Sequence, residues 1–158
     1  MLDISEELKN YILEHAMYLI AILSIIKLIS FKIDSSIWAI ELSEGKNKGN
    51  QKGYKFFNVL FYAIVLIYFM YSDGKLVEHD FRMNQATLWF VNLIIFFVYI
   101  VFDLLVVDMI IYAKIQPKFM AIKDVPWQIN LIEHAKIAIM MMVFGAVFGF
   151  LASILSTI

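Results

Sequence analysis

Two carboxylates and one ammonium group lie well inside apolar stretches of this 158-residue chain. Asp103 and Asp108 fall within residues 88–113, and Lys27 falls within residues 11–31. A charged side chain at the centre of a bilayer costs roughly 3 kcal/mol or more, so it normally faces protein or water, where it serves transport or helix pairing. These three residues are therefore the first candidates for a functional site.

Asp103 shares one face of its expected helix with Asn92 and Tyr99. At 3.6 residues per turn, the three positions fall within roughly 40° of one line along the helix. A helix over residues 88–113 would place Asp103 about 15 Å from one end, near mid-depth. The spacing predicts a polar stripe that handles a cation or proton, or else a hydrogen-bonded seam between neighbouring helices.

Asp108 follows Asp103 by five residues, about 140° around an α-helix, and so faces another direction. Counted from the same end of the membrane, Asp108 and Lys27 lie at similar depth. We therefore expect an ion pair between Lys27 and Asp108, or a Lys27 side chain that extends to the headgroups. A role for both residues in an ion pathway is the alternative.

A weaker hypothesis concerns histidines and carboxylates that the expected topology places on one membrane face. Glu14, His15, His79 and Asp80 are all suitable zinc ligands. The simpler interpretation is that these histidines are solvated or hydrogen-bonded at the interface. His134 is expected at the opposite face from His15, which excludes paired haem ligation, and no cofactor is expected.

Four apolar stretches must position these residues. The composition is 62% hydrophobic and only 17% charged, whereas a soluble domain has about 25% charged residues. A transmembrane helix needs about 20 apolar residues, and Ser72-Asp73-Gly74 is a turn signal that should end the second stretch. The sequence predicts one domain, an all-α integral membrane bundle of four transmembrane helices at about 11–31, 56–71, 88–113 and 137–158.

The basic residues predict how this bundle is oriented. Cytoplasmic loops retain lysine and arginine, and nine lysines fall in residues 32–55 and 114–136. The N-terminal tail and residues 72–87 hold only Lys9, Lys75 and Arg82. We therefore expect an integral protein of a bacterial cytoplasmic membrane with both termini outside.

Small residues recur along the last stretch at helical spacing. Gly145, Gly149, Ala152 and Ser156 would let another helix approach closely. The partner helix could belong to this chain or to a second copy.

Composition also limits the partners and the chemistry. A net charge of -1 provides no field for nucleic acid, and the absence of cysteine excludes disulfides and thiolate metal sites. The sequence contains no nucleotide-binding, serine hydrolase or metalloprotease motif. The expected partners are the lipid bilayer and either further copies of the chain or a larger membrane protein.

The last third of the chain resembles a poorly characterised family of small bacterial four-span membrane proteins. The resemblance rests on Asp103-Leu-Leu-Val-Val-Asp108, Pro117-Lys-Phe119 and the later His134. It implies that Asp103, Asp108 and His134 act together, and it carries no activity.

These features favour a homo-oligomeric channel or transporter that moves a cation or proton past Asp103. Four helices enclose little space, so a conduction path would most naturally need several copies. A structural or regulatory subunit would use the same polar stripe to bind a larger membrane partner. The third hypothesis is an integral membrane enzyme that acts on a lipid or another apolar substrate.

Overall fold

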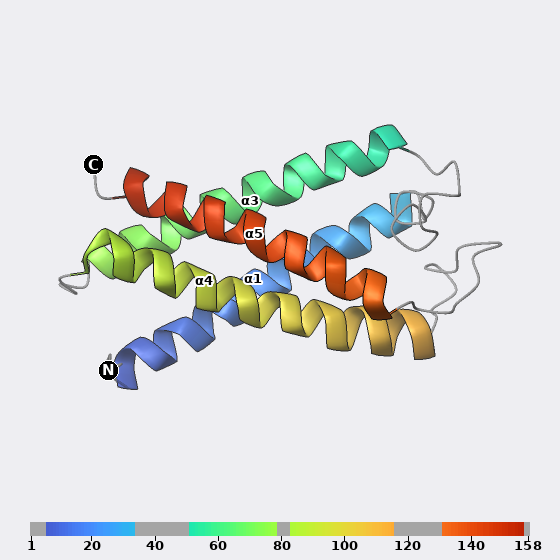
Figure 1. Cartoon of the computed structure of the whole chain (residues 1–158), viewed down its shortest axis with the longest axis horizontal. Helices are drawn as coiled ribbons and strands as arrows, with labels where there is room; N and C mark the ends of the chain where they lie inside the picture. The colour runs from blue at the N-terminus through green and yellow to red at the C-terminus, as the bar shows by residue number, and fades with distance from the viewer. Residues whose placement is uncertain (1–5, 34–50, 79–82, 116–130, 157–158) are drawn as a thin grey trace.

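The protein is an all-α bundle of long helices (Figure 1). A computed structural model describes residues 6–33, 51–78, 83–115 and 131–156. Its helices, in chain order, are α1 (Glu6–Ile33), α3 (Gln51–Glu78), α4 (Gln85–Phe102), the π-helix η1 (Asp103–Ile115) and α5 (Leu131–Leu155).

Four helical segments are long and apolar enough to cross a membrane, as the sequence predicts. They comprise Glu6–Ser30, Lys55–Glu78, Gln85–Val107 and Lys136–Leu155. Their outward faces are apolar as well: Val59 is 70% exposed and Ile139 is 65% exposed. Helices that are apolar around their whole circumference belong in lipid, so the chain is an integral membrane protein.

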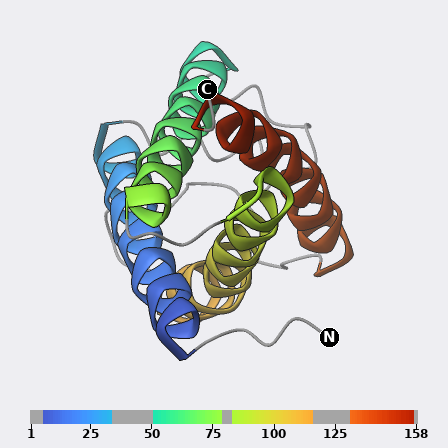
Figure 2. The same cartoon turned by 90° about the vertical axis from the view of Figure 1, so that its left-hand side faces the viewer.

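The helices form a closed ring in the order α1, α3, α5 and α4 (Figure 2). The contact between α4 and α5 is the most extensive, and that between α1 and α3 is the least. Figure 1 shows that α1 and α4 begin at the end of the bundle where α3 and α5 finish. Within the ring, α1 therefore runs parallel to α4 and antiparallel to α3.

Helix α4 begins at a side-chain cap. The Asn84 Oδ1 atom accepts hydrogen bonds from the Thr87 backbone N–H and from Thr87 Oγ1, both at 2.9 Å. Such a cap satisfies a backbone donor that the first helical turn leaves without a partner. The start of the helix that carries Asn92, Tyr99 and Asp103 is thereby fixed.

Helix α3 does not end where the sequence predicts. The expected turn at Ser72-Asp73-Gly74 is wrong, because the helix continues to Glu78. Ser72, Asp73 and Leu76 are all 0% exposed, so the residues beyond the expected turn pack into the bundle. Burial of Leu76 and its neighbours outweighs the local turn preference of these three residues.

The third helix departs from α-helical geometry at Asp103. Its backbone N–H still donates to Tyr99 O and Ile100 O, and the chain then continues as a π-helix to Ile115. In a π-helix the hydrogen bonds join residues five apart, and such segments are rare and frequent at functional sites. Positions 103 and 108 therefore lie one hydrogen-bonded turn apart, which corrects the 140° separation expected for an α-helix.

The small face of α5 packs against α4 of the same chain. A side-chain carbon at Gly145 would collide with the Phe96 ring, and one at Gly149 would lie 3.1 Å from Asn92 Cβ. Ala152 is fully buried, and Ser156 continues the helical bonding by donating its backbone N–H to Ala152 O. These residues therefore explain the close approach of α4 and α5 without a second copy.

The centre of the bundle is filled by aromatic side chains. Phe96 contacts Phe69 with ring centroids 6.1 Å apart and Tyr99 with centroids 5.7 Å apart. None of the three is more than 2% exposed. We call Phe69, Phe96 and Tyr99 the aromatic layer, because they occupy the depth between Asn92 and Asp103.

Candidate functional site

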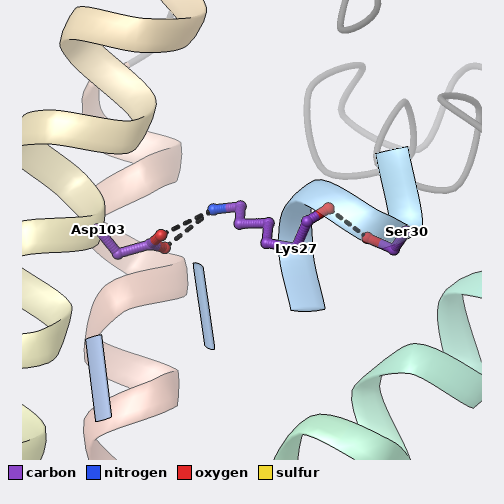
Figure 3. Close-up of polar contacts among 3 residues, drawn as sticks. All are labelled: Lys27, Ser30 and Asp103. Atoms are coloured by element: carbon purple, nitrogen blue, oxygen red, sulfur yellow. Dashed lines mark hydrogen bonds and ion pairs between the residues drawn. The ribbon is translucent and has the colours of Figure 1, made fainter. Parts of the chain in front are cut away.

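Lys27 of α1 and Asp103 at the start of η1 form an ion pair between neighbouring helices (Figure 3). The Lys27 Nζ atom lies 3.0 Å from both Asp103 Oδ1 and Asp103 Oδ2, so the ammonium group contacts the two carboxylate oxygens equally. The side chains are only 12% and 13% exposed. The expected Lys27–Asp108 pairing is therefore wrong: Lys27 binds Asp103.

The backbone around Lys27 is held by a short local bond. Ser30 Oγ donates to the Lys27 carbonyl oxygen at 2.7 Å, and Ser30 is fully buried. Side chains bonded to a neighbouring carbonyl in a helix use an acceptor within their own turn. The hydroxyl is thus satisfied without a contact to the ion pair, as Figure 3 shows.

The ion pair lies nearer one end of the membrane-spanning helices than the sequence predicts. Lys27 is three residues from the end of its span at Ser30, and Asp103 is four residues from the end of its span at Val107. Four residues of helix correspond to about 6 Å. The mid-depth placement of Asp103 came from a third span that was expected to end at residue 113.

A cavity adjoins this ion pair and is surrounded by all four helices. Its volume is about 60 Å³. One water molecule needs roughly 10–15 Å³ of such space, so the cavity can hold several. Polar and apolar groups share its wall: Leu23, Ile26, Lys27, Phe57, Asn58, Phe61, Tyr62, Tyr99, Asp103, Ile137, Met140 and Met141.

Asn92 and Tyr99 lie on the inward face of α4, together with most of its buried residues. They do not form a continuous polar stripe with Asp103. Phe96 is fully buried between them and contacts Tyr99 within the aromatic layer. The interior therefore has two polar regions at different depths, separated by aromatic side chains.

The second polar region contains a carboxylate that the sequence analysis did not select. Asp73 of α3 is fully buried, and its Oδ2 atom accepts a hydrogen bond of 3.0 Å from Asn92 Nδ2. The same amide nitrogen lies 3.4 Å from Gly149 O. Asp73 was taken for a turn residue, although Leu76 continues the helical spacing of Phe69 and Ser72 and would have indicated a longer span.

A network of hydroxyl groups joins α1 to α3 beside this pair. Tyr11 Oη lies 2.7 Å from Ser72 O and 2.9 Å from Ser72 Oγ. Tyr68 Oη lies 2.8 Å from His15 O and 2.9 Å from His15 Nδ1. Both tyrosines therefore use their polar atoms to hold the two helices together.

The structure does not assemble the hypothetical zinc site from the residues that it describes. His15 is 7% exposed and stacks on Tyr11 at 4.0 Å, while Glu14 accepts a hydrogen bond from Tyr18 at 2.8 Å. Within residues 6–33, 51–78, 83–115 and 131–156, no group of three histidine or acidic side chains could hold a metal. Four predicted residues lie outside the described chain or have side chains that are not described: His79, Asp80, Asp108 and His134.

The chemistry that this arrangement allows is exchange of small cations at carboxylate oxygens. Asp103 faces a cavity large enough for water, and its charge is balanced by a lysine rather than by a fixed metal. No family model matches this sequence, and no curated protein or solved structure is similar to it. The function is therefore argued from the residues of this chain alone.

Proposed function

We propose that the protein is a small membrane transporter or channel that moves a proton or another small cation, with Asp103 as its ion-binding carboxylate. The observation that carries this proposal is the Lys27–Asp103 ion pair at the wall of a cavity. A charge pair inside a membrane protein commonly marks an ion pathway. Here the Lys27 ammonium group occupies the position that a transported cation would take.

The ion pair supports transport by competition. A cation or proton that binds Asp103 would displace Lys27 Nζ from the two carboxylate oxygens, at 3.0 Å from each. Lys27 carries its charge on a flexible stem, so its head group can move into the adjacent cavity. Asp103 would thereby exchange one positive charge for another.

The aromatic layer bears on how such a protein would work. Phe69 and Phe96 are fully buried between the two polar regions, and hydrocarbon rings offer no ligands to an ion. A transport cycle in one chain would require these rings to move, whereas a path between copies would bypass them. We retain the homo-oligomer in the proposal, in a bacterial cytoplasmic membrane.

Flux into liposomes tests the proposal. Purified protein should conduct protons or monovalent cations, and Asp103→Asn should reduce this flux by at least tenfold because the amide cannot carry the exchanged charge. Lys75→Gln is the matched control: Lys75 pairs with Glu78 at 2.9 Å on the exposed side of α3, so its loss should leave flux unchanged. Flux per chain that falls on dilution in lipid would support a path between copies.

Two results would contradict the proposal. Well-folded protein without flux under proton, sodium and potassium gradients would exclude transport of small cations and favour the structural or regulatory subunit. In that role, the Lys27–Asp103 pair would only join α1 to α4. Equal flux in wild type and Asp103→Asn would instead remove Asp103 from the pathway.

A further inference from the structure

The buried Asp73–Asn92 pair has two oxygen atoms that lack a donor. Among the described residues, neither Asp73 Oδ1 nor Asn92 Oδ1 has a hydrogen-bond partner. Both residues are 0% exposed, and they come from helices on opposite sides of the ring. Buried acceptors without partners are rare in folded proteins, so a pair of them in contacting side chains indicates a missing ligand.

The orientation of Asn92 is determined by its neighbours. Its Nδ2 atom lies 3.0 Å from Asp73 Oδ2 and 3.4 Å from Gly149 O, and both of these are acceptors. A flipped amide would place Oδ1 against two other oxygens. The amide nitrogen therefore faces these acceptors, and Oδ1 is the atom that needs a donor.

The neighbouring donors are already engaged. Tyr11 and Ser72 bond to each other, and Tyr11 Oη also bonds to Ser72 O. Lys75 pairs with Glu78 on the exposed side of α3. Within the described chain, no lysine, arginine or histidine contacts Asp73, so its charge has no counter-ion there.

Other titratable groups on the packed helices do not supply one. Three of them, Glu14 and Tyr71 as well as Tyr11, are neutral or anionic and so could not balance a carboxylate. Over residues 85–102, α4 carries only Tyr99 as a titratable side chain. The described titratable side chain of α5 is Lys136, at the opposite end of that helix. An ionised Asp73 would be a buried, unpaired charge, which is strongly disfavoured.

We propose that Asp73 and Asn92 form a proton-binding site. One proton taken from water forms an O–H bond at Asp73 Oδ1 and is shared with Asn92 Oδ1, while Asn92 Nδ2 donates to Asp73 Oδ2. The side chain changes from anionic to neutral, and no other bond forms or breaks. A single proton thus satisfies both orphaned oxygens in a cyclic acid–amide pair.

A metal cation fits these residues less well. Calcium takes six to eight oxygen ligands and magnesium requires six, but the site offers two side-chain oxygens, and the nearby Gly149 carbonyl already faces Asn92 Nδ2. The described residues hold no cluster of three metal-binding side chains. A proton needs only one donor position and one acceptor.

Infrared spectroscopy of the purified full-length protein in lipid tests this site. At neutral pH the wild type should show the carbonyl band of a protonated carboxyl group, with slow deuterium exchange because the site is buried. Asp73→Asn should abolish that band. Asp103→Asn is the matched control and should retain it, because Asp103 is ion-paired with Lys27 and does not need a proton.

A second variant covers the case in which Asp73→Asn does not fold. Asn92→Leu removes the amide partner, so the acid band should remain and shift to higher frequency as its hydrogen bonds are lost. A wild-type protein without an acid band at neutral pH would overturn the proposal. So would a band that disappears when sodium chloride replaces choline chloride, which would identify a sodium site. The site is independent of transport, because the band is measured without any flux.

Discussion

At the scale of single residues, the Lys27–Asp103 pair is held in place by the cost of separating its charges. Both side chains are almost fully buried, and each supplies the counter-charge of the other. Removing one partner from a buried pair typically costs about 3–5 kcal/mol, whereas replacing both by apolar residues is often neutral. A purely exposed ion pair contributes about 0–1 kcal/mol.

A double-mutant cycle measures this coupling. Lys27→Met and Asp103→Leu should each lower the free energy of unfolding by about 3–5 kcal/mol, and the double variant should recover most of that loss. Unfolding is followed by circular dichroism during denaturant titration in detergent. The control cycle uses Lys75→Met and Glu78→Leu, whose side chains are 43% and 69% exposed. Additive losses at Lys27 and Asp103 would show that the two charges do not depend on each other.

The sequence allowed both charges to be found but paired Lys27 with the wrong carboxylate. Their depths were counted from the expected cytoplasmic ends of the spans. Counted from the helix starts, Lys27 is 21 residues after Glu6 and Asp103 is 18 residues after Gln85. Because α1 and α4 run parallel from the same end of the bundle, this count brings the two residues to similar depth. Parallel packing is a tertiary property, so the sequence alone could not choose between the two counts.

At the scale of the helices, glycine has opposite roles in α3 and α5. Gly74 lies inside α3, and a side-chain carbon there would have nothing within 4 Å. Gly145 lies inside α5, and a side-chain carbon there would collide with Phe96. One glycine merely weakens its helix, while the other makes room for a neighbouring ring.

Alanine at these two positions should change stability in opposite directions. Gly74→Ala should raise the free energy of unfolding by about 0.5–1 kcal/mol, because alanine restricts the unfolded chain and fits a helix. Gly145→Ala should lower it by about 1–3 kcal/mol, since Phe96 must leave its packed position. The same detergent titration measures both variants. Destabilisation by Gly74→Ala would argue for the turn that the sequence predicts rather than for a continuous α3.

The number of spanning helices was predictable because it depends on long apolar runs, whereas the ends of α3 and α4 were not. Ser72-Asp73-Gly74 favours a turn locally, but Leu76 packs into the core and Asp73 bonds to Asn92. Both contacts come from other helices. The π-helical geometry after Asp103 likewise has no marker in local composition, because its residues would suit an α-helix equally well.

At the scale of the whole molecule, the bundle places different chemistry at its two ends. The end where α1 begins and α3 finishes contains the Tyr11–Ser72 contact and the Asp73–Asn92 pair. The other end contains the cavity and the Lys27–Asp103 pair. The aromatic layer lies between them. The direction of any transport therefore depends on which end faces the cytoplasm.

Cysteine labelling determines that orientation cleanly, because the native chain has no cysteine. Figure 1 places the start of α1 and the end of α5 at the same end of the bundle, and the lysine-rich loops should remain in the cytoplasm. In intact cells, Thr157→Cys should react with a membrane-impermeant maleimide, while Asn47→Cys should react only after the membrane is permeabilised. The reverse pattern would place the cavity and Lys27–Asp103 outside. Asp103 would then meet its cation from the external side, and the gradients of the flux experiment would have to be reversed.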